Sequence, residues 1–121
     1  MKLILVIFIF LFCNNSYSKE FQNYYNVKYI SNYDGDTFTA KILLFKKGSE
    51  KIFVEDNVRI KNINTPEIKS KNLKERKKAL KAKAILKERL TNAEKIDLLK
   101  CERDKYGRLL CELFLDGKKF I

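Results

Sequence analysis

The sequence predicts an α+β, mostly β fold: a five-stranded, partly open Greek-key barrel of OB type, capped by one helix. Three observations predict this fold class. Segments rich in β-branched and aromatic residues come first, a segment with apolar residues three and four positions apart follows, and two apolar segments around a tight turn come last. The order βββ-α-ββ suits the OB topology. No repeat or flexible linker interrupts the chain, so we expect one compact domain.

The first 18 residues have the pattern of a secretory signal peptide. Lys2 is a short basic start, Leu3–Cys13 is an apolar run of 11 residues, and small residues at Ser16 and Ser18 suit a signal peptidase. The apolar run is too short for a membrane span, which takes about 20 residues. A lipoprotein site at Cys13 fits less well, because Phe12 precedes it where such sites have a small residue. We therefore expect an exported protein, secreted or periplasmic, whose mature domain is 19–121.

The first two predicted strands are Val27–Ser31 and Thr37–Phe45, because both are rich in β-branched and aromatic residues. In the second strand, four apolar residues alternate with other residues, and this predicts one buried face. The four are Phe38, Ala40, Ile42 and Leu44. A turn is predicted at 46–49, where the sequence reads Lys-Lys-Gly-Ser. Beyond the turn, Ile52–Val54 and Val58–Ile63 are expected to form one bulged third strand.

A strongly basic segment follows the predicted strands. From Lys69 to Arg89 there are ten lysines and arginines against two glutamates. In the later part, apolar residues at helical spacing predict an amphipathic helix with a basic outer face, ending near Asn92. These apolar residues are Ala82, Ile85, Leu86, Leu90 and Ala93. The earlier part, 69–78, has little apolar periodicity and is expected to be a mobile basic loop.

The last two predicted strands, Ile96–Arg103 and Arg108–Leu115, form a hairpin around the turn at 104–107. Cys101 and Cys111 lie on opposite sides of this turn, and one register would place them across from each other. In an exported protein such a pair can oxidise to a disulfide. The sequence is equally consistent with two small buried hydrophobic residues.

The formal net charge of the whole chain is +11 at pH 7. A surplus of this size on a small exported protein favours a polyanionic partner, because basic side chains placed near phosphates release condensed counterions. Composition alone is as compatible with a soluble cationic surface or with affinity for anionic lipid.

The string Asp34-Gly35-Asp36-Thr37 places two carboxylates around a glycine where two predicted strands meet. Carboxylates, amides and backbone carbonyls are the oxygen ligands that Ca²⁺ takes. The chain has no histidine, which excludes the usual zinc sites, Ser-His and Cys-His nucleophile pairs and an imidazole base. Taken alone, the string is also an ordinary turn sequence.

The second string is Asn64-Thr65-Pro66-Glu67. Proline fixes its own φ and favours an extended Thr65, so the Thr65 carbonyl and the Glu67 side chain would be held in a set relation. A carboxylate beside a metal can take a proton from water. Arg59, on the preceding strand, has the planar fork that matches two phosphate oxygens. Taken alone, Glu67 fits a solvated loop and Arg59 fits a surface ion pair.

The third string, Asp104-Lys105-Tyr106-Gly107-Arg108, places an arginine directly after a tight turn. Such an arginine can donate to the negative charge that develops on a pentacoordinate phosphorus. It can equally be an exposed cation at the end of a hairpin.

The three strings occur in one order, with the predicted helix between the second and the third, and this arrangement resembles the staphylococcal nuclease-like (thermonuclease) family over 26–121. The resemblance implies that 19–121 is an OB-fold nuclease domain. It also implies Ca²⁺-dependent hydrolysis of phosphodiester bonds in DNA and RNA, with 3′-phosphate ends as products. Nucleic acid, favouring single-stranded DNA or RNA, is then the expected partner, and no stable protein partner is implied.

The resemblance also implies a metal site. Asp36 would be a direct Ca²⁺ ligand, Asp34 a nearby supporting carboxylate, and Thr65 the donor of a backbone carbonyl. At position 64 this chain has asparagine where the family typically has a second metal-binding aspartate. An amide oxygen can still coordinate, but with one charge fewer we expect weaker Ca²⁺ binding.

For catalysis, the resemblance implies that Glu67 is the general base and that Arg59 and Arg108 hold the scissile phosphate. The sequence stops at Ile121, where the family continues into two further helices that close the barrel, so apolar barrel surface is expected to face water. The alternative to a nuclease is a degenerate or truncated member that binds nucleic acid without cutting it. A third interpretation is a cationic surface or lipid-binding protein.

Overall fold

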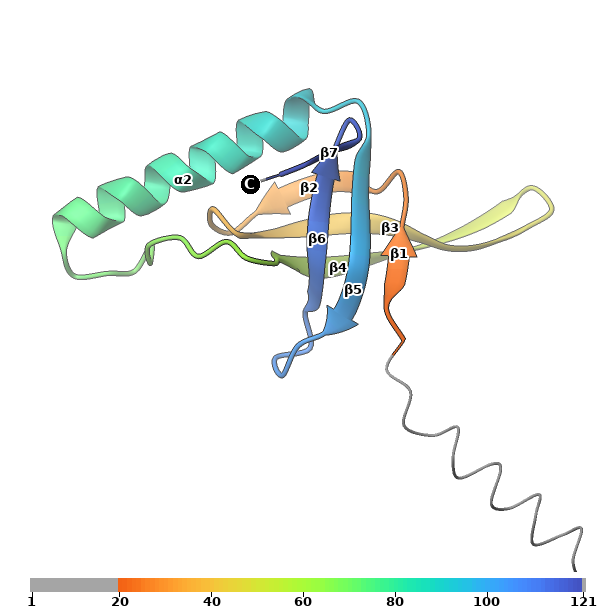
Figure 1. Cartoon of the computed structure of the whole chain (residues 1–121). Coiled ribbons are helices and arrows are strands. Elements are labelled where there is room, and N and C mark those ends of the chain that lie inside the picture. The colour runs from red at the N-terminus through yellow and green to blue at the C-terminus, as the bar shows by residue number, and fades with distance from the viewer. Residues whose placement is uncertain (1–19, 121) are drawn as a thin grey trace, which may run out of the picture.

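The computed structural model describes residues 20–120, which contain seven strands and one helix (Figure 1). In chain order these are β1 (Gln22–Tyr24), β2 (Lys28–Asn32), β3 (Thr37–Lys47), β4 (Glu50–Ile60), α2 (Leu73–Asn92), β5 (Ile96–Arg103), β6 (Leu109–Leu115) and β7 (Lys118–Lys119). The predicted signal peptide and Cys13 lie outside the described residues. Within them, no helix has the length and apolar character that crossing a membrane requires.

The strands form one sheet in the order β1-β5-β6-β4-β3-β2, with β7 paired to β6. All pairs are antiparallel except β4 with β6. β1 and β2 follow each other in the chain but lie at opposite ends of the strand order, so the sheet curls to bring its two ends near each other. Asn26, which lies between these strands, has a left-handed φ of 53°. The predicted α+β, mostly β class is confirmed. The expected five strands correspond to β2–β6, and the two short strands were not predicted.

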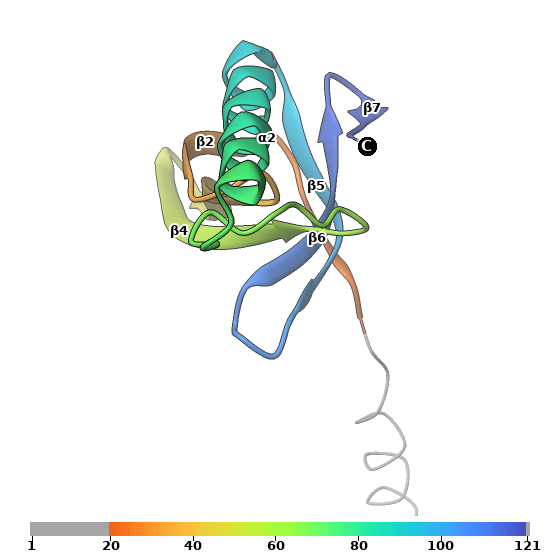
Figure 2. The same ribbon diagram turned by 90° about the vertical axis from the view of Figure 1, so that its left-hand side faces the viewer.

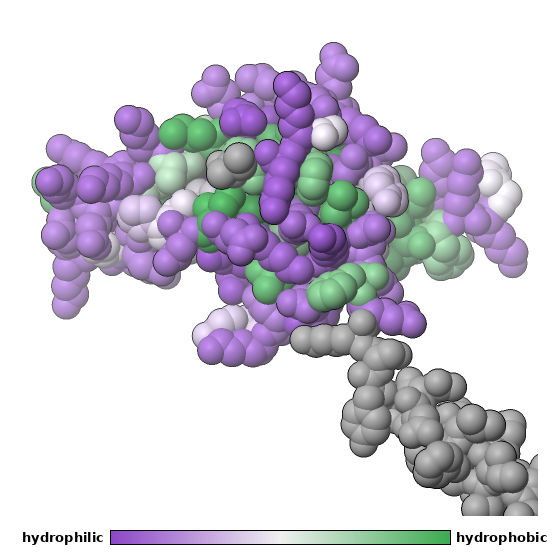
Figure 3. All heavy atoms as spheres, viewed as in Figure 1, coloured by the Kyte–Doolittle hydropathy of each residue, from purple (hydrophilic) through white to green (hydrophobic). Residues whose placement is uncertain are grey.

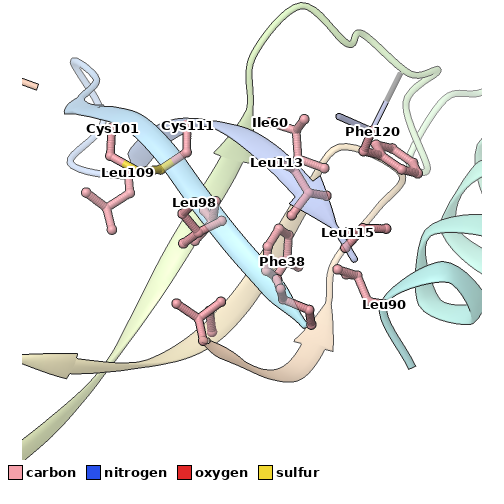
Figure 4. Close-up of a cluster of buried hydrophobic side chains, with 14 of the residues drawn as sticks. Phe38, Ile60, Leu90, Leu98, Cys101, Leu109, Cys111, Leu113, Leu115 and Phe120 are labelled. Carbon is pink, nitrogen blue, oxygen red and sulfur yellow. A yellow bond between two sulfur atoms is a disulfide. The ribbon is translucent and has the colours of Figure 1, made fainter. Parts of the chain in front are cut away.

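The core fills the inside of this curled sheet and extends to the helix (Figure 4). Phe38, Ala40 and Ile42 are buried as the alternating pattern of β3 predicts. Leu44 was predicted to continue this face, but its side chain is 55% exposed. The reason is that β3 and β4 run on past the core as a hairpin, with a shift in pairing register between Leu43 and Phe45. The bulge was predicted in the strand after the turn, but the register shift lies in β3. β4 is one continuous strand that ends at Ile60.

Helix α2 begins earlier than the basic composition suggested. Asn72 caps it: its side-chain Oδ1 accepts hydrogen bonds from the backbone N–H groups of Lys74 and Glu75. The expectation of a mobile loop over 69–78 is therefore wrong from Leu73 onward. The predicted end at Asn92 is confirmed.

The apolar face of α2 differs in part from the prediction. Leu86 and Leu90 are buried in the core as expected, and Ala79 is buried as well. Ile85 was predicted to lie on the same face but is 47% exposed. The face of the helix that packs on the core is therefore narrower than predicted, with Leu86 and Leu90 in the core cluster but not Ile85.

The predicted hairpin is formed by β5 and β6, and its two cysteines are joined in a disulfide. The pairing register shifts between Leu99 and Glu102, where Lys100 has a left-handed φ of 52°. This bulge brings Cys101 opposite Cys111, with their Cα atoms 4.2 Å apart. Both residues are buried at one end of the core, so the disulfide also contributes to packing.

Candidate active site

The turn between β2 and β3 is held by the side chain of Asp34. Its Oδ1 accepts hydrogen bonds from the backbone N–H groups of Asp36, at 3.0 Å, and Thr37, at 2.8 Å. This is the local side-chain to backbone bonding by which aspartate stabilises turns. The turn therefore has a fixed shape before any ligand binds.

The carboxylate of Asp36 is the centre of a buried polar network. Its Oδ2 accepts hydrogen bonds from the Thr65 backbone N–H, at 3.1 Å, and from the Thr65 hydroxyl, at 3.2 Å. Arg59 Nη2 lies 3.4 Å from the same oxygen, and Arg59 Nη1 donates to the Ile60 carbonyl. The pairing of Thr37 with Arg59 across β3 and β4 explains why residues 36 and 59 meet. Three sequence segments are thereby tied to one carboxylate.

The two aspartates of the turn differ in acidity. Burial alone would raise the pKa of Asp36, but hydrogen bonds from Asp34 and Thr65 and the nearby Arg59 guanidinium together lower it. For Asp34, burial and the neighbouring Asp36 carboxylate raise the pKa. Of the two, Asp36 is therefore the stable anion, and Asp34 is the one that more readily holds a proton.

Two residues that sequence reasoning missed join this turn to helix α2. Asn32 is buried, and its Nδ2 donates to the carbonyl of Asp34, at 3.0 Å, and to the carbonyl of Lys83 on the helix, at 2.9 Å. Gly35 is in close contact with the helix as well: a Cβ placed on it would lie 2.7 Å from the Ala82 Cβ and 2.8 Å from the Thr65 Cγ2. A residue with a side chain at position 35 would therefore clash with Ala82 and Thr65. Its contacts are distant in sequence, so no local pattern predicts them.

An open cleft of about 720 Å³ lies beside the turn. It brings together Asp34, Glu67 and Arg108 from three separate segments, and Tyr33 and Lys83 also line it. Figure 2 shows the connection from β4 to α2, which carries Glu67, running past the N-terminal end of the helix. The cleft thus has two carboxylates, an arginine and a lysine on its walls, which is the chemistry that an anionic substrate and an attacking water require.

Arg108 is held at the border of two clefts. It lines the first, and it also lines a second cleft of about 440 Å³ together with Arg59. Asp104 fixes it through a hydrogen bond from Arg108 Nε to Oδ2 of 2.9 Å, and the guanidinium carbon lies 5.3 Å from the centre of the Tyr106 ring. Burial tends to raise the pKa of Asp104, but hydrogen bonds from Arg108 and Tyr106 lower it overall. The arginine is thus positioned by the turn, as the third string suggested.

The predicted site residues are only partly brought together. Asp36, Thr65 and Arg59 form the buried network, while Glu67 and Arg108 face the first cleft. Thr65 contacts Asp36 through its backbone N–H and its hydroxyl, and not through the backbone carbonyl that was predicted to bind the metal. Asn64 is exposed and lies outside the linings of both clefts. Arg59 does form an ion pair, but with a buried carboxylate instead of one at the surface.

The donors near the turn fit a hard cation in chemical kind. Asp34, Asp36 and Thr65 offer only oxygen atoms, and the two cysteines of the described region are in a disulfide. Among residues 20–120, however, no three acidic, histidine or cysteine side chains gather as a ready metal site. A cation would therefore share Asp36 with Arg59 and would need water or substrate oxygens to complete its coordination.

The sequence was compared with models of known protein families. The model of the family described as staphylococcal nuclease homologue matches residues 57–121. The matched part includes the second and third strings, Arg59, helix α2 and the disulfide hairpin, whereas the Asp34 turn precedes it. No curated protein matches the chain.

Proposed function

Because this chain belongs to the staphylococcal nuclease homologue family, we propose that it hydrolyses phosphodiester bonds in DNA and RNA and leaves 3′-phosphate ends. The observation that carries the proposal is the first cleft, where Glu67 and Arg108 come from different segments to face one space beside Asp34. A general base must reach the attacking water while an arginine reaches the phosphate, and this space allows both.

Glu67 is the general base in this proposal. It is exposed to the cleft, where it can accept a proton from a water molecule that attacks phosphorus. Arg108 donates to the phosphate oxygens, on which negative charge builds up in the transition state. Its bond to Asp104 uses only Nε, one of the five N–H donors of a guanidinium.

Arg59 has a second role in the proposal. It lines the second cleft with Arg108, and the Asp36 carboxylate holds its guanidinium in place. Two arginines on one opening suit the planar, two-pronged recognition of a phosphate group. Asp36 therefore acts on the substrate through Arg59 as well as through any bound cation.

We also propose that Ca²⁺ is the cofactor. Asp36 would hold it directly, the Thr65 carbonyl and the Asn64 amide oxygen would be further oxygen donors, and Asp34 would be a supporting carboxylate nearby. When bound, the ion supplies positive charge beside the phosphate and makes a neighbouring water more acidic. Glu67 and the two arginines remain the groups that move the proton and hold the phosphate.

A specific observation also favours a second candidate function, which is binding without cleavage. In the described residues there is no cluster of three metal-binding side chains, and Asp36 is already engaged by Thr65 and Arg59. If no cation binds, the basic helix and the arginines of the two clefts still attract nucleic acid. Binding that weakens steeply with salt but produces no cleavage under any Ca²⁺ concentration would identify this function.

The proposed substrate is single-stranded DNA or RNA, and the proposed location is outside the cytoplasm. Unpaired strands can enter an open cleft that carries Lys83 and Tyr33, because a cation attracts the backbone and an aromatic ring can stack on a base. The Cys101–Cys111 disulfide supports export, because such bonds persist in oxidising compartments.

Replacing Asn64 with aspartate tests the proposed cation site. The added carboxylate should lower the Ca²⁺ concentration that gives half-maximal cleavage of single-stranded DNA, by roughly tenfold, because ligand charge sets Ca²⁺ affinity. Asn92→Asp is the control, since it adds the same charge at an exposed residue that lines neither cleft. The proposal of a Ca²⁺ site beside residue 64 fails if both variants shift the Ca²⁺ titration equally or if neither shifts it.

A further inference from the structure

The hairpin formed by β3 and β4 extends past the core at the end opposite the Asp34 turn (Figure 1). We call residues 43–54 the hairpin arm. It carries six large apolar side chains that are each between 37% and 55% exposed. These are Leu43, Leu44, Phe45, Ile52, Phe53 and Val54. Figure 3 shows the apolar surface of the arm next to the body of the domain and a hydrophilic tip beyond it.

Four lysines and two glutamates border this apolar surface, so its border has a net positive charge. At the outer end, Lys46 is paired with Lys51 across the strands, and Lys47 is paired with Glu50. Lys41 lies at the inner end, with its Nζ 4.8 Å from the centre of the Phe53 ring. Exposed aliphatic and aromatic side chains bordered by lysines are typical of segments that lie in the interface of an anionic membrane.

We propose that the hairpin arm docks on an anionic lipid bilayer, with its apolar side chains among the upper acyl chains and its lysines at the phosphate headgroups. Four of the six apolar side chains are aliphatic and cannot stack on bases, so nucleic acid fits the arm less well. A second copy would bring its own lysines against these lysines. An anionic bilayer satisfies both the apolar and the cationic groups.

Docking of this kind leaves the candidate active site accessible. The Asp34 turn lies at the Thr37 end of β3, which is 11 residues long, and the arm lies at the Lys47 end of the same strand. The arm does not contribute to either cleft beside the turn. Membrane docking is therefore independent of whether the cleft cuts nucleic acid.

The chain has no tryptophan, so one introduced tryptophan reports on its own surroundings. In the full chain, Phe45→Trp places this reporter on the arm, and Leu80→Trp places it on the exposed face of α2. The two native side chains are matched in exposure, at 53% and 54%. The measurement is tryptophan emission during titration with phosphatidylglycerol/phosphatidylcholine vesicles, some of which contain brominated lipid as a quencher.

We expect the Phe45→Trp emission to shift to shorter wavelength and to be quenched by brominated lipid, while the Leu80→Trp emission stays unchanged. Replacing Lys46 and Lys51 with glutamine in the Phe45→Trp chain should weaken vesicle binding about fivefold for each lysine. The reporter is local, so lipid contact elsewhere in the chain does not produce this signal.

Three results would overturn the proposal. The first is an unchanged Phe45→Trp emission at saturating vesicle concentrations. The second is a shift that single-stranded DNA produces without vesicles, which would assign the arm to nucleic acid. The third is a shift that depends only on protein concentration, which would assign the arm to contact between copies of the chain.

Discussion

Gly35→Ala should destabilise the protein by about 2–3 kcal/mol, the cost typical of an added group in a closely packed site. The new Cβ would lie 2.7 Å from the Ala82 Cβ and 2.8 Å from the Thr65 Cγ2, so either the helix or the Thr65 segment must move. Because Thr65 donates to Asp36, the same displacement should reduce cleavage. Urea denaturation measures the stability change, and hydrolysis of single-stranded DNA measures the activity.

A double variant separates this clash from a simple loss of backbone freedom. Ala82→Gly removes the nearest of the three atoms that the new Cβ would meet, at a cost of about 1 kcal/mol for glycine inside a helix. Gly35→Ala combined with Ala82→Gly should therefore be more stable than the sum of the two single changes predicts. Strict additivity would show that the contact between turn and helix is not what requires glycine.

The second large effect is expected for Asp36→Asn. This change keeps the shape of the side chain but leaves Arg59, whose side chain is 19% exposed, without its anionic partner. Two hydrogen bonds from Thr65 also lose their charged acceptor. The free energy of unfolding should fall by about 2–4 kcal/mol, as for other charged groups that are left unpaired away from water. Denaturation in the presence of chelator excludes any contribution from bound cation.

Asp56→Asn is the matched control for Asp36→Asn. Asp56 forms an ion pair with Arg103, with a shorter contact of 2.6 Å, but the Arg103 side chain is 56% exposed. Exposed pairs contribute little, so the control should lower stability by less than about 1 kcal/mol. Equal costs for the two variants would mean that the Asp36 network is no more than another surface ion pair.

The parts of the fold that the sequence predicted well are those with strong local patterns. The β5–β6 hairpin, the first half of β3 and the end of α2 all have clear periodicity or turn residues. The start of α2 was missed although a signal was present, because Asn72 followed by Glu75 is a helix-capping pattern. Strands β1 and β7 have three and two residues, which are too few for any period to show.

The sequence predicted which residues belong to the candidate site, but it did not predict which of them contact each other. The carboxylates and arginines were identified from their strings, but nothing local indicates that Arg59 bonds to Asp36 instead of solvent. The roles of Asn32 and Gly35 depend on a helix about fifty residues later, as in the hydrogen bond from Asn32 to Lys83. Likewise, Leu44 continues the apolar alternation of β3, and only the position of the core decides that it is exposed.

The proposed role of Glu67 as the general base in the first cleft is tested most directly by comparing the wild type with Glu67→Gln. The measurement is the rate of single-stranded DNA cleavage across a Ca²⁺ titration, with DNA affinity measured in parallel. Loss of a general base should slow cleavage by about 100-fold or more while binding stays nearly unchanged. If both proteins cut equally slowly at every Ca²⁺ concentration, the catalytic account is contradicted and binding without cleavage replaces it.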